Sequence, residues 1–262
     1  ERPRRPPSED DQHRASDSDH SDGELSSGPA TNVQVPDAAG VKTIVHIFSY
    51  CLFSLSCVQS RVRGTCVEPI PLKSDAHGDL NDDFTWGTIG RAISGEVVDA
   101  VIFTPPSGSF VDQPTAFLPA LRSADGQGLF GLADLIAGLK PAVASENLLW
   151  MRTAEEAQKL HRIKKPWCII YEVLGDVKPT LFLGMSHLIN LPGVTLTPVV
   201  IRSLSLEVVS FGFTFVDDVF DDLEALYLSL VACITGYRPG QYNGVVEDSS
   251  CDEDEQHSAT EV

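Results

Sequence analysis

The sequence predicts an α/β domain with a mostly parallel sheet, an antiparallel strand pair near its end, and helices on both faces. Three observations lead to this fold class. Apolar, β-branched runs alternate with segments of helical periodicity between residues 41 and 235. The early runs are apolar throughout, as in strands that a parallel sheet buries on both faces. Two late runs follow each other closely and therefore favour an antiparallel pair.

The first half of this region predicts three strands and two helices. Its first run, VKTIVHIF, is β-branched and typical of a buried strand, and its last, VVDAVIF, is closed by the turn-forming Thr104, Pro105 and Pro106. The expected elements are a strand at 41–48, a helix at 50–59, a short strand at 62–68, a helix at 82–94 that ends near Gly95, and a strand at 97–103.

The second half begins with a loop rich in glycine and proline that reaches about residue 128. After it, apolar residues at helical spacing predict the longest helix, and WCIIYEV predicts another buried strand. The expected elements are a helix at 141–165, a strand at 167–173, paired strands at 195–201 and 204–215, and a closing helix at 220–235.

Two acidic tails, residues 1–40 and 241–262, flank this domain at 41–240, and we expect both to be disordered. They carry net charges of −5 and −7 and few large apolar side chains, so neither can offset its ordering entropy by burial. Serines followed by acids, such as Ser16 and Ser249, suit acid-directed phosphorylation, although tails that only keep the chain in solution would look the same. A protein partner that binds through these tails is one expectation.

The charge distribution also bears on whether the domain can bind nucleic acid. Of the total net charge of −18, the two tails hold all but −6, so the central domain is mildly acidic. A domain that binds duplex DNA unaided normally has a basic face, because phosphate neutralisation supplies most of the affinity. The acidic balance of the central domain gives no sign of such a basic face.

The six cysteines have neither a metal-binding spacing nor the density of a disulfide scaffold. Most lie in apolar stretches, which predicts buried free thiols and no metal site. No apolar run is long enough to cross a bilayer, and the first residues lack a signal-peptide pattern. We therefore expect no membrane association and an intracellular, reducing compartment, either nuclear or cytoplasmic.

Candidate site residues follow the predicted strands, because ligands of open α/β sheets bind beyond the carboxyl ends of the strands. An acid after the second strand is the usual group that binds ribose hydroxyls, and two prolines stiffen the loop after a later strand. The candidates are Phe48, Ser49, Glu68, Asp79, Pro105, Ser107 and Glu172.

At these positions the sequence resembles the cytosine-C5 DNA methyltransferases, particularly compact methyltransferase-like domains associated with retroelements. Residues 46–50 (HIFSY) stand where the family has Phe-Ser/Cys-Gly-x-Gly, and Glu68 and Asp79 match its ribose and adenine acids. The resemblance implies a Rossmann-like methyltransferase sheet. It also implies S-adenosylmethionine as cofactor, bound through Phe48, Ser49, Glu68, Asp79 and Pro105.

The resemblance continues through the catalytic segments. The run from Asp99 to Ser107 matches the strand and Pro-Pro-Cys loop of the nucleophile, and Glu172 lies on the strand that carries the family's glutamate. Leu121-Arg122-Ser123 and Glu146-Asn147 resemble segments of the compact relatives. These matches imply catalytic roles for Ser107 and Glu172 and a nucleic-acid substrate.

Several departures indicate a catalytically degenerate domain. Ser107 occupies the place of the cysteine, and a hydroxyl without an adjacent base is a much poorer nucleophile than a thiolate. Val173 replaces the asparagine after Glu172, and Tyr50, Leu52 and Phe53 put bulk where the family has glycines. We therefore expect weak or undetectable S-adenosylmethionine binding and a role as a binding or scaffold module.

Two alternatives stay open. The chain could be an active S-adenosylmethionine-dependent methyltransferase acting on nucleic acid. If it were an amino-methyltransferase, Phe110 would have to supply the aromatic ring that stacks on the base. It could also be an unrelated α/β interaction domain in which the order of motifs is accidental.

Overall fold

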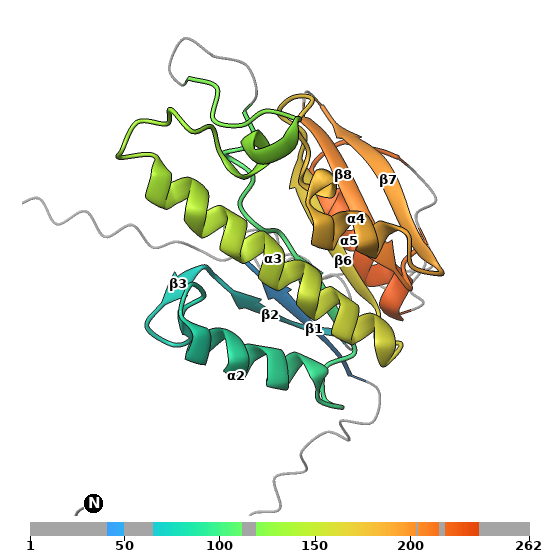
Figure 1. The fold of residues 1–262 in the computed structure, drawn as a ribbon. Helices are drawn as coiled ribbons and strands as arrows, with labels where there is room; N and C mark the ends of the chain where they lie inside the picture. Colours follow the sequence, from blue (N-terminus) through green and yellow to red (C-terminus); the bar gives the residue numbers. More distant parts are fainter. Residues whose placement is uncertain (1–40, 50–64, 112–118, 203, 215–217, 236–262) are drawn as a thin grey trace, which may run out of the picture. The chain divides into compact units, whose positions relative to one another are not determined.

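The structure, a computed structural model, describes residues 41–49, 65–111, 119–202, 204–214 and 218–235 (Figure 1). The predicted helix at 50–59, the bulky Tyr50, Leu52 and Phe53, and the predicted tails lie outside the described residues.

A seven-stranded sheet in the order β2-β1-β5-β6-β8-β7-β9 forms the centre of the described domain. β1 pairs in parallel with β2 and β5, and β5 pairs in parallel with β6. β8 alone runs in the opposite direction, between β6 and β7, while β9 is parallel to β7. The predicted fold class, a mostly parallel sheet with a late antiparallel pair, is confirmed. The strands are β1 (Lys42–Ile47), β2 (Thr65–Ile70), β5 (Ala100–Phe103), β6 (Trp167–Glu172), β7 (Val194–Ile201), β8 (Leu204–Phe211) and β9 (Val219–Phe220).

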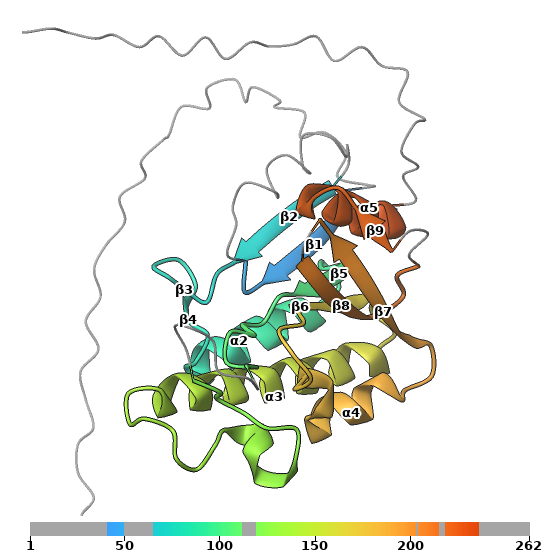
Figure 2. The same cartoon turned by 90° about the horizontal axis from the view of Figure 1, so that it is seen from above.

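Helices cover both faces of this sheet (Figure 2). On one face, α2 (Asp83–Ser94), α3 (Lys140–Arg162) and α4 (Leu183–Ile189) bury a large apolar cluster that includes Val45, Phe103 and Trp150. On the other face, α5 (Leu223–Thr235) packs on a second cluster that includes Ile44 and Ile102. Because successive strand residues point to opposite faces, both faces need apolar side chains, and the continuous apolar runs follow from that.

The two ends of α2 are capped differently, one by a neighbouring residue and the other by a residue distant in the sequence. The Asp82 side chain caps the first turn by accepting a hydrogen bond from the Thr85 amide at 2.8 Å. At the other end the ammonium group of Lys165 donates to the carbonyls of Ile93, at 2.9 Å, and Gly95. A cation at this position compensates the negative end of the helix dipole. The predicted helix at 82–94 is therefore confirmed.

The boundaries of two other elements differ from the predicted ones, and tertiary contacts explain the differences. β2 extends to Ile70, beyond the predicted end at 68, and contains Pro69. The Ile70 carbonyl faces β1 and accepts from the Phe48 amide at 2.8 Å, so the nitrogen of Pro69 faces the sheet edge, where no donor is needed. The closing helix starts at Leu223 rather than 220, because Val219 and Phe220 pair with β7.

Small elements were not predicted from the sequence. They are the hairpin β3 (Lys73–Ser74) and β4 (Gly78–Asp79), the 3₁₀ turns η1 (Gly126–Phe130) and η2 (Pro179–Leu181), the helix α4 and the strand β9. Within the described ranges, no helix has the length and apolar character that a membrane crossing requires. Cys66, Cys168 and Cys233 are free thiols; burial was expected and holds for Cys168, whereas Cys66 is exposed on the edge strand.

Candidate functional site

The strand order reverses between β1 and β5, and this switch point is where the fold class binds ligands. The first residues after the two strands are joined, since the Thr104 amide donates to the Ile47 carbonyl at 3.0 Å. The Thr104 hydroxyl also donates to the Phe48 carbonyl at 3.0 Å. The carboxyl ends of these strands therefore form a closed backbone junction.

Phe48, a predicted cofactor residue, is a core residue. Its side chain is fully buried and stacks on Trp86 with ring centroids 5.9 Å apart. Its backbone has φ 65°, a left-handed conformation that is rare for a bulky residue and must be held by its surroundings. The next residue, Ser49, is also buried, and its hydroxyl has no hydrogen-bond partner among the described residues.

The two predicted cofactor acids lie in different surroundings. Glu68 is exposed within β2, opposite Val45, and lies two residues before the strand ends rather than at its end, as the sequence predicted. Asp79 belongs to the β3–β4 hairpin and forms an ion pair with Lys73 at 2.7 Å. It also accepts from the Asn81 amide at 2.9 Å. The Lys73 hydrogen bond is the main cause that lowers the pKa of Asp79.

The two predicted catalytic residues lie at the carboxyl ends of neighbouring strands. Ser107 lies in the loop after β5 and Glu172 is the last residue of β6; both are half-buried. Pro105 is buried in the same loop, and the Pro106 carbonyl accepts from the Trp150 indole at 2.7 Å. Within the described part of the chain, no base forms a hydrogen bond with the Ser107 hydroxyl.

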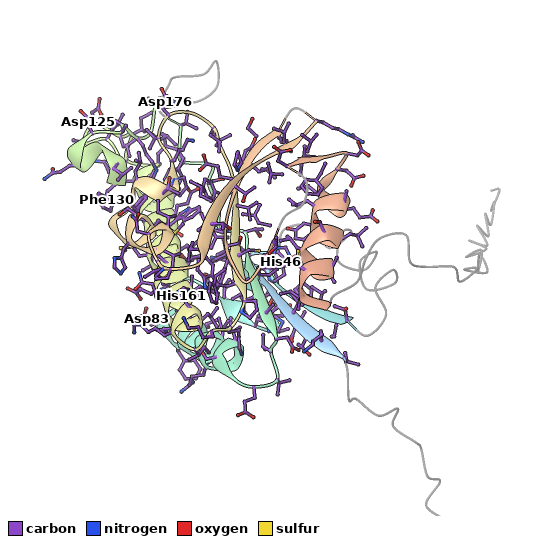
Figure 3. The ribbon with its side chains drawn as sticks, turned by 90° about the vertical axis from the view of Figure 1, so that its right-hand side faces the viewer. His46, Asp83, Asp125, Phe130, His161 and Asp176 are labelled. Carbon is purple, nitrogen blue, oxygen red and sulfur yellow. The ribbon has the colours of Figure 1, made fainter. Side chains whose placement is uncertain are left out.

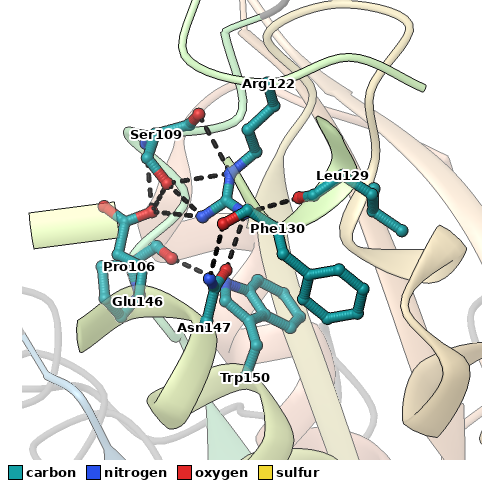
Figure 4. A network of polar contacts seen from close by, with 8 residues as sticks. All are labelled: Pro106, Ser109, Arg122, Leu129, Phe130, Glu146, Asn147 and Trp150. Carbon is teal, nitrogen blue, oxygen red and sulfur yellow. Dashed lines mark hydrogen bonds and ion pairs between the residues drawn. The ribbon is translucent and has the colours of Figure 1, made fainter. Parts of the chain in front are cut away.

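A buried polar network fixes the end of this loop (Figure 4). Arg122, 1% exposed, donates through Nε to the carbonyl and hydroxyl of Ser109, both at 3.1 Å. Its Nη1 donates to the Leu129 carbonyl and to Asn147 Oδ1, both at 2.7 Å. Ser109 in turn donates its amide, at 3.0 Å, and its hydroxyl to Glu146 Oε2. One arginine thus joins the loop after β5, η1 and α3.

Burial lowers the pKa of Arg122 to about 10, and the nearby Glu146 carboxylate opposes that shift. The guanidinium therefore stays charged at neutral pH. It also lies over the ring of Phe110, 4.2 Å from the centroid, a favourable cation–π geometry. Because Ser109 is 4% exposed and hydrogen-bonded on both sides, its hydroxyl holds the loop in place rather than facing a substrate.

A second buried group lies between β6 and β8. The Tyr171 hydroxyl donates to Glu207, whose other oxygen pairs with Lys178 at 2.5 Å. Burial, together with the Glu207 carboxylate, raises the pKa of Tyr171 far above its ordinary value. Tyr171 therefore stays neutral, and Glu207 already has two partners.

His46 lies beneath the switch point, between the sheet and α5 (Figure 3). Its Nε2 is 2.9 Å from the Thr104 hydroxyl and 3.3 Å from the Tyr227 hydroxyl. Its Nδ1 is buried without a hydrogen-bond partner among the described residues, and burial lowers the pKa of the ring to about 3. The imidazole is therefore neutral.

The described residues were compared with the groups that a metal ion or S-adenosylmethionine would need. In the described ranges no three His, Cys, Asp or Glu side chains are placed to hold a metal ion. Of the groups implied to bind S-adenosylmethionine, Asp79 is already paired with Lys73 and the Phe48 amide with Ile70. Among the described residues, these two groups are therefore engaged within the chain itself.

The network was not predicted as a site, although both of its main segments were noted as family-like. The signal was an arginine at the end of the apolar run 117–121 and a Glu-Asn pair early in the longest helix.

Comparisons with protein-family models, curated protein sequences and solved structures found no match.

Proposed function

We propose that this chain is a methyltransferase-like domain without methyltransferase activity, which serves as a binding module. The resemblance of its strand-end motifs to cytosine-C5 DNA methyltransferases suggests the ancestry. A mostly parallel sheet with one late reversed strand supports that arrangement. The loss of activity is argued from the site.

One observation carries the proposal: among the described residues no base forms a hydrogen bond with Ser107, and the carboxylates of Glu146 and Glu207 are held by other groups. Glu146 is occupied by Ser109 and Arg122, and Glu207 by Tyr171 and Lys178. A general base must be within hydrogen-bond reach of the proton that it removes. Ser107 has no such base among the described residues, so its hydroxyl stays un-ionised and unreactive toward a cytosine ring.

The charge of the chain favours protein over nucleic acid as the bound partner. The central domain has a net charge of −6, and the residues outside it add −12. Phosphate backbones would be repelled at close range unless another chain supplied cations. The free thiols Cys66, Cys168 and Cys233 agree with the reducing, intracellular compartment that we propose.

Methyl transfer tests this proposal. Wild type, Ser107→Cys and Glu172→Ala would be incubated with tritiated S-adenosylmethionine and cytosine-containing DNA, and cofactor binding would be followed by calorimetry. We expect no incorporation by any of the three, because the thiol alone restores neither a base nor a cofactor site. Incorporation by wild type that disappears in Glu172→Ala would establish the active-enzyme alternative. Incorporation by Ser107→Cys alone would show that only the nucleophile was missing.

A further inference from the structure

The loop that leads from the polar network to α3, residues 123–139, combines exposed apolar side chains with two acids. Phe130 is 47% exposed and Ile136 65% exposed. Asp125 and Asp134 are its only charged residues, and both are exposed. An open hollow in this loop is lined by Ser123, Asp125, Gln127, Phe130 and Leu132, among others. Figure 3 shows Asp125 and Phe130 in the same part of the molecule.

Hydrogen bonds from other segments hold the part of this loop around Phe130. The carbonyl of Leu129 accepts from Arg122 at 2.7 Å, and that of Phe130 accepts from Asn147 at 2.8 Å. The Leu132 amide donates to the Leu121 carbonyl at 3.0 Å. The backbone around Phe130 is thus held by the buried Arg122 and the half-buried Asn147, so a partner would not have to order this part of the loop on binding.

The apolar surface continues beyond the loop. The Phe130 ring packs edge-on against Phe182, with centroids 5.0 Å apart, and Leu181 beside it is 45% exposed. Contiguous exposed apolar side chains with a polar rim are typical of protein-interaction sites.

We propose that the 123–139 loop is the docking surface of the binding module and takes a basic, apolar segment of another protein. This inference rests on the proposed function. An apolar anchor side chain of the partner would enter the hollow beside Phe130, and Lys or Arg residues next to that anchor would pair with Asp125 and Asp134. Charge complementarity selects this occupant.

The same charges argue against other occupants. Two copies of this chain would bring four acids of the loop together, and each copy has a net charge of −18. That charge opposes self-association through this surface. Nucleic acids and anionic membranes have the same sign and would be repelled as well.

A library of random peptides of about twelve residues, displayed on phage, would test the docking surface with the full-length chain as target. We expect enriched peptides to combine an apolar anchor with Lys or Arg. Affinities of the enriched peptides would then be measured by fluorescence polarisation. The double variant Phe130→Ser/Ile136→Ser should bind them about tenfold or more weakly, as expected for central anchors. Asp125→Asn/Asp134→Asn should bind more weakly and with less dependence on salt.

Phe84→Ser is the matched control, since Phe84 is 78% exposed on α2, outside the loop. It should leave affinity unchanged. Ile136→Ser alone removes a side chain with little burial, so it keeps the test valid if the double variant does not fold. Absence of enrichment, enrichment of peptides without basic residues, or equal binding by all the loop variants would overturn the docking surface. Methyl transfer separately decides the proposed function, so the two failures are distinguishable.

Discussion

His46 should make the stability of this protein fall steeply in weak acid. The ring is 2% exposed, and burial lowers its pKa to about 3 from an ordinary value of 6.5. In the unfolded chain the same ring binds a proton below pH 6.5, whereas in the folded protein it stays neutral. Protonation therefore favours the unfolded state as the pH falls from 6.5 toward 3. Between pH 7 and pH 5 the loss from this one group is about 2 kcal/mol.

The perturbation is His46→Leu, which removes the titrating ring and places an apolar side chain of similar size against α5. The Thr104 hydroxyl keeps its acceptor, the Phe48 carbonyl, so the substitution leaves that donor satisfied. At pH 7 the free energy of unfolding should stay within about 1.5 kcal/mol of wild type. Urea denaturation at pH 7, 6 and 5 measures the difference between the two proteins.

We expect wild type to lose about 2 kcal/mol more than His46→Leu over this range. His187→Leu is the control, because His187 is exposed on α4, and it should follow wild type. Burial also lowers the pKa of His161. Because wild type and His46→Leu both contain His161, it contributes equally to the pH dependence of their free energies of unfolding. Equal losses in wild type and His46→Leu would refute the claim that the fold holds His46 neutral.

Four further substitutions test the packing and the helix ends. Arg122→Met should lower the free energy of unfolding by about 3 kcal/mol, because it removes the cation beside the half-buried Glu146 carboxylate and leaves the Leu129 and Asn147 acceptors without this donor. Calorimetric unfolding measures this, and a loss below about 1 kcal/mol would contradict it. Gly90→Ala should cost about 2 kcal/mol in urea denaturation, because its Cβ would lie 2.9 Å from the Glu156 carboxylate. In the same helix Gly87→Ala meets no atom within 4 Å and should stabilise by about 1 kcal/mol; equal effects at the two sites would rule out the steric reason. Lys165→Met should cost about 1 kcal/mol and weaken amide-exchange protection at the end of α2, and unchanged protection would count against that cap.

The candidate site was predictable only in part. The loop after β5 was placed correctly, because an apolar strand closed by two prolines is a local pattern. Glu68 was assigned to the end of its strand, but whether a strand stops at Pro69 depends on which edge its nitrogen faces. That edge is set by pairing with β1, which the local sequence does not contain.

The sequence by itself determined the features that depend on neighbouring residues. Apolar runs predicted β1, β5 and β6, and the local sequence also predicted α2, ending near Gly95, and α3, from its helical spacing. The late strand pair followed in the same way, since its two runs are separated by a short turn. Each of these elements is specified within about ten to twenty residues, the range over which periodicity and capping act.

Only the tertiary structure decided which side chains meet across the chain. Arg122 contacts Ser109, thirteen residues before it, and Asn147, twenty-five after it. His46 meets Tyr227 across 181 residues, and that contact accounts for part of its burial. The stability of a buried charge or a neutral buried imidazole comes from partners and exclusion of water, and both exist only after distant segments have packed together.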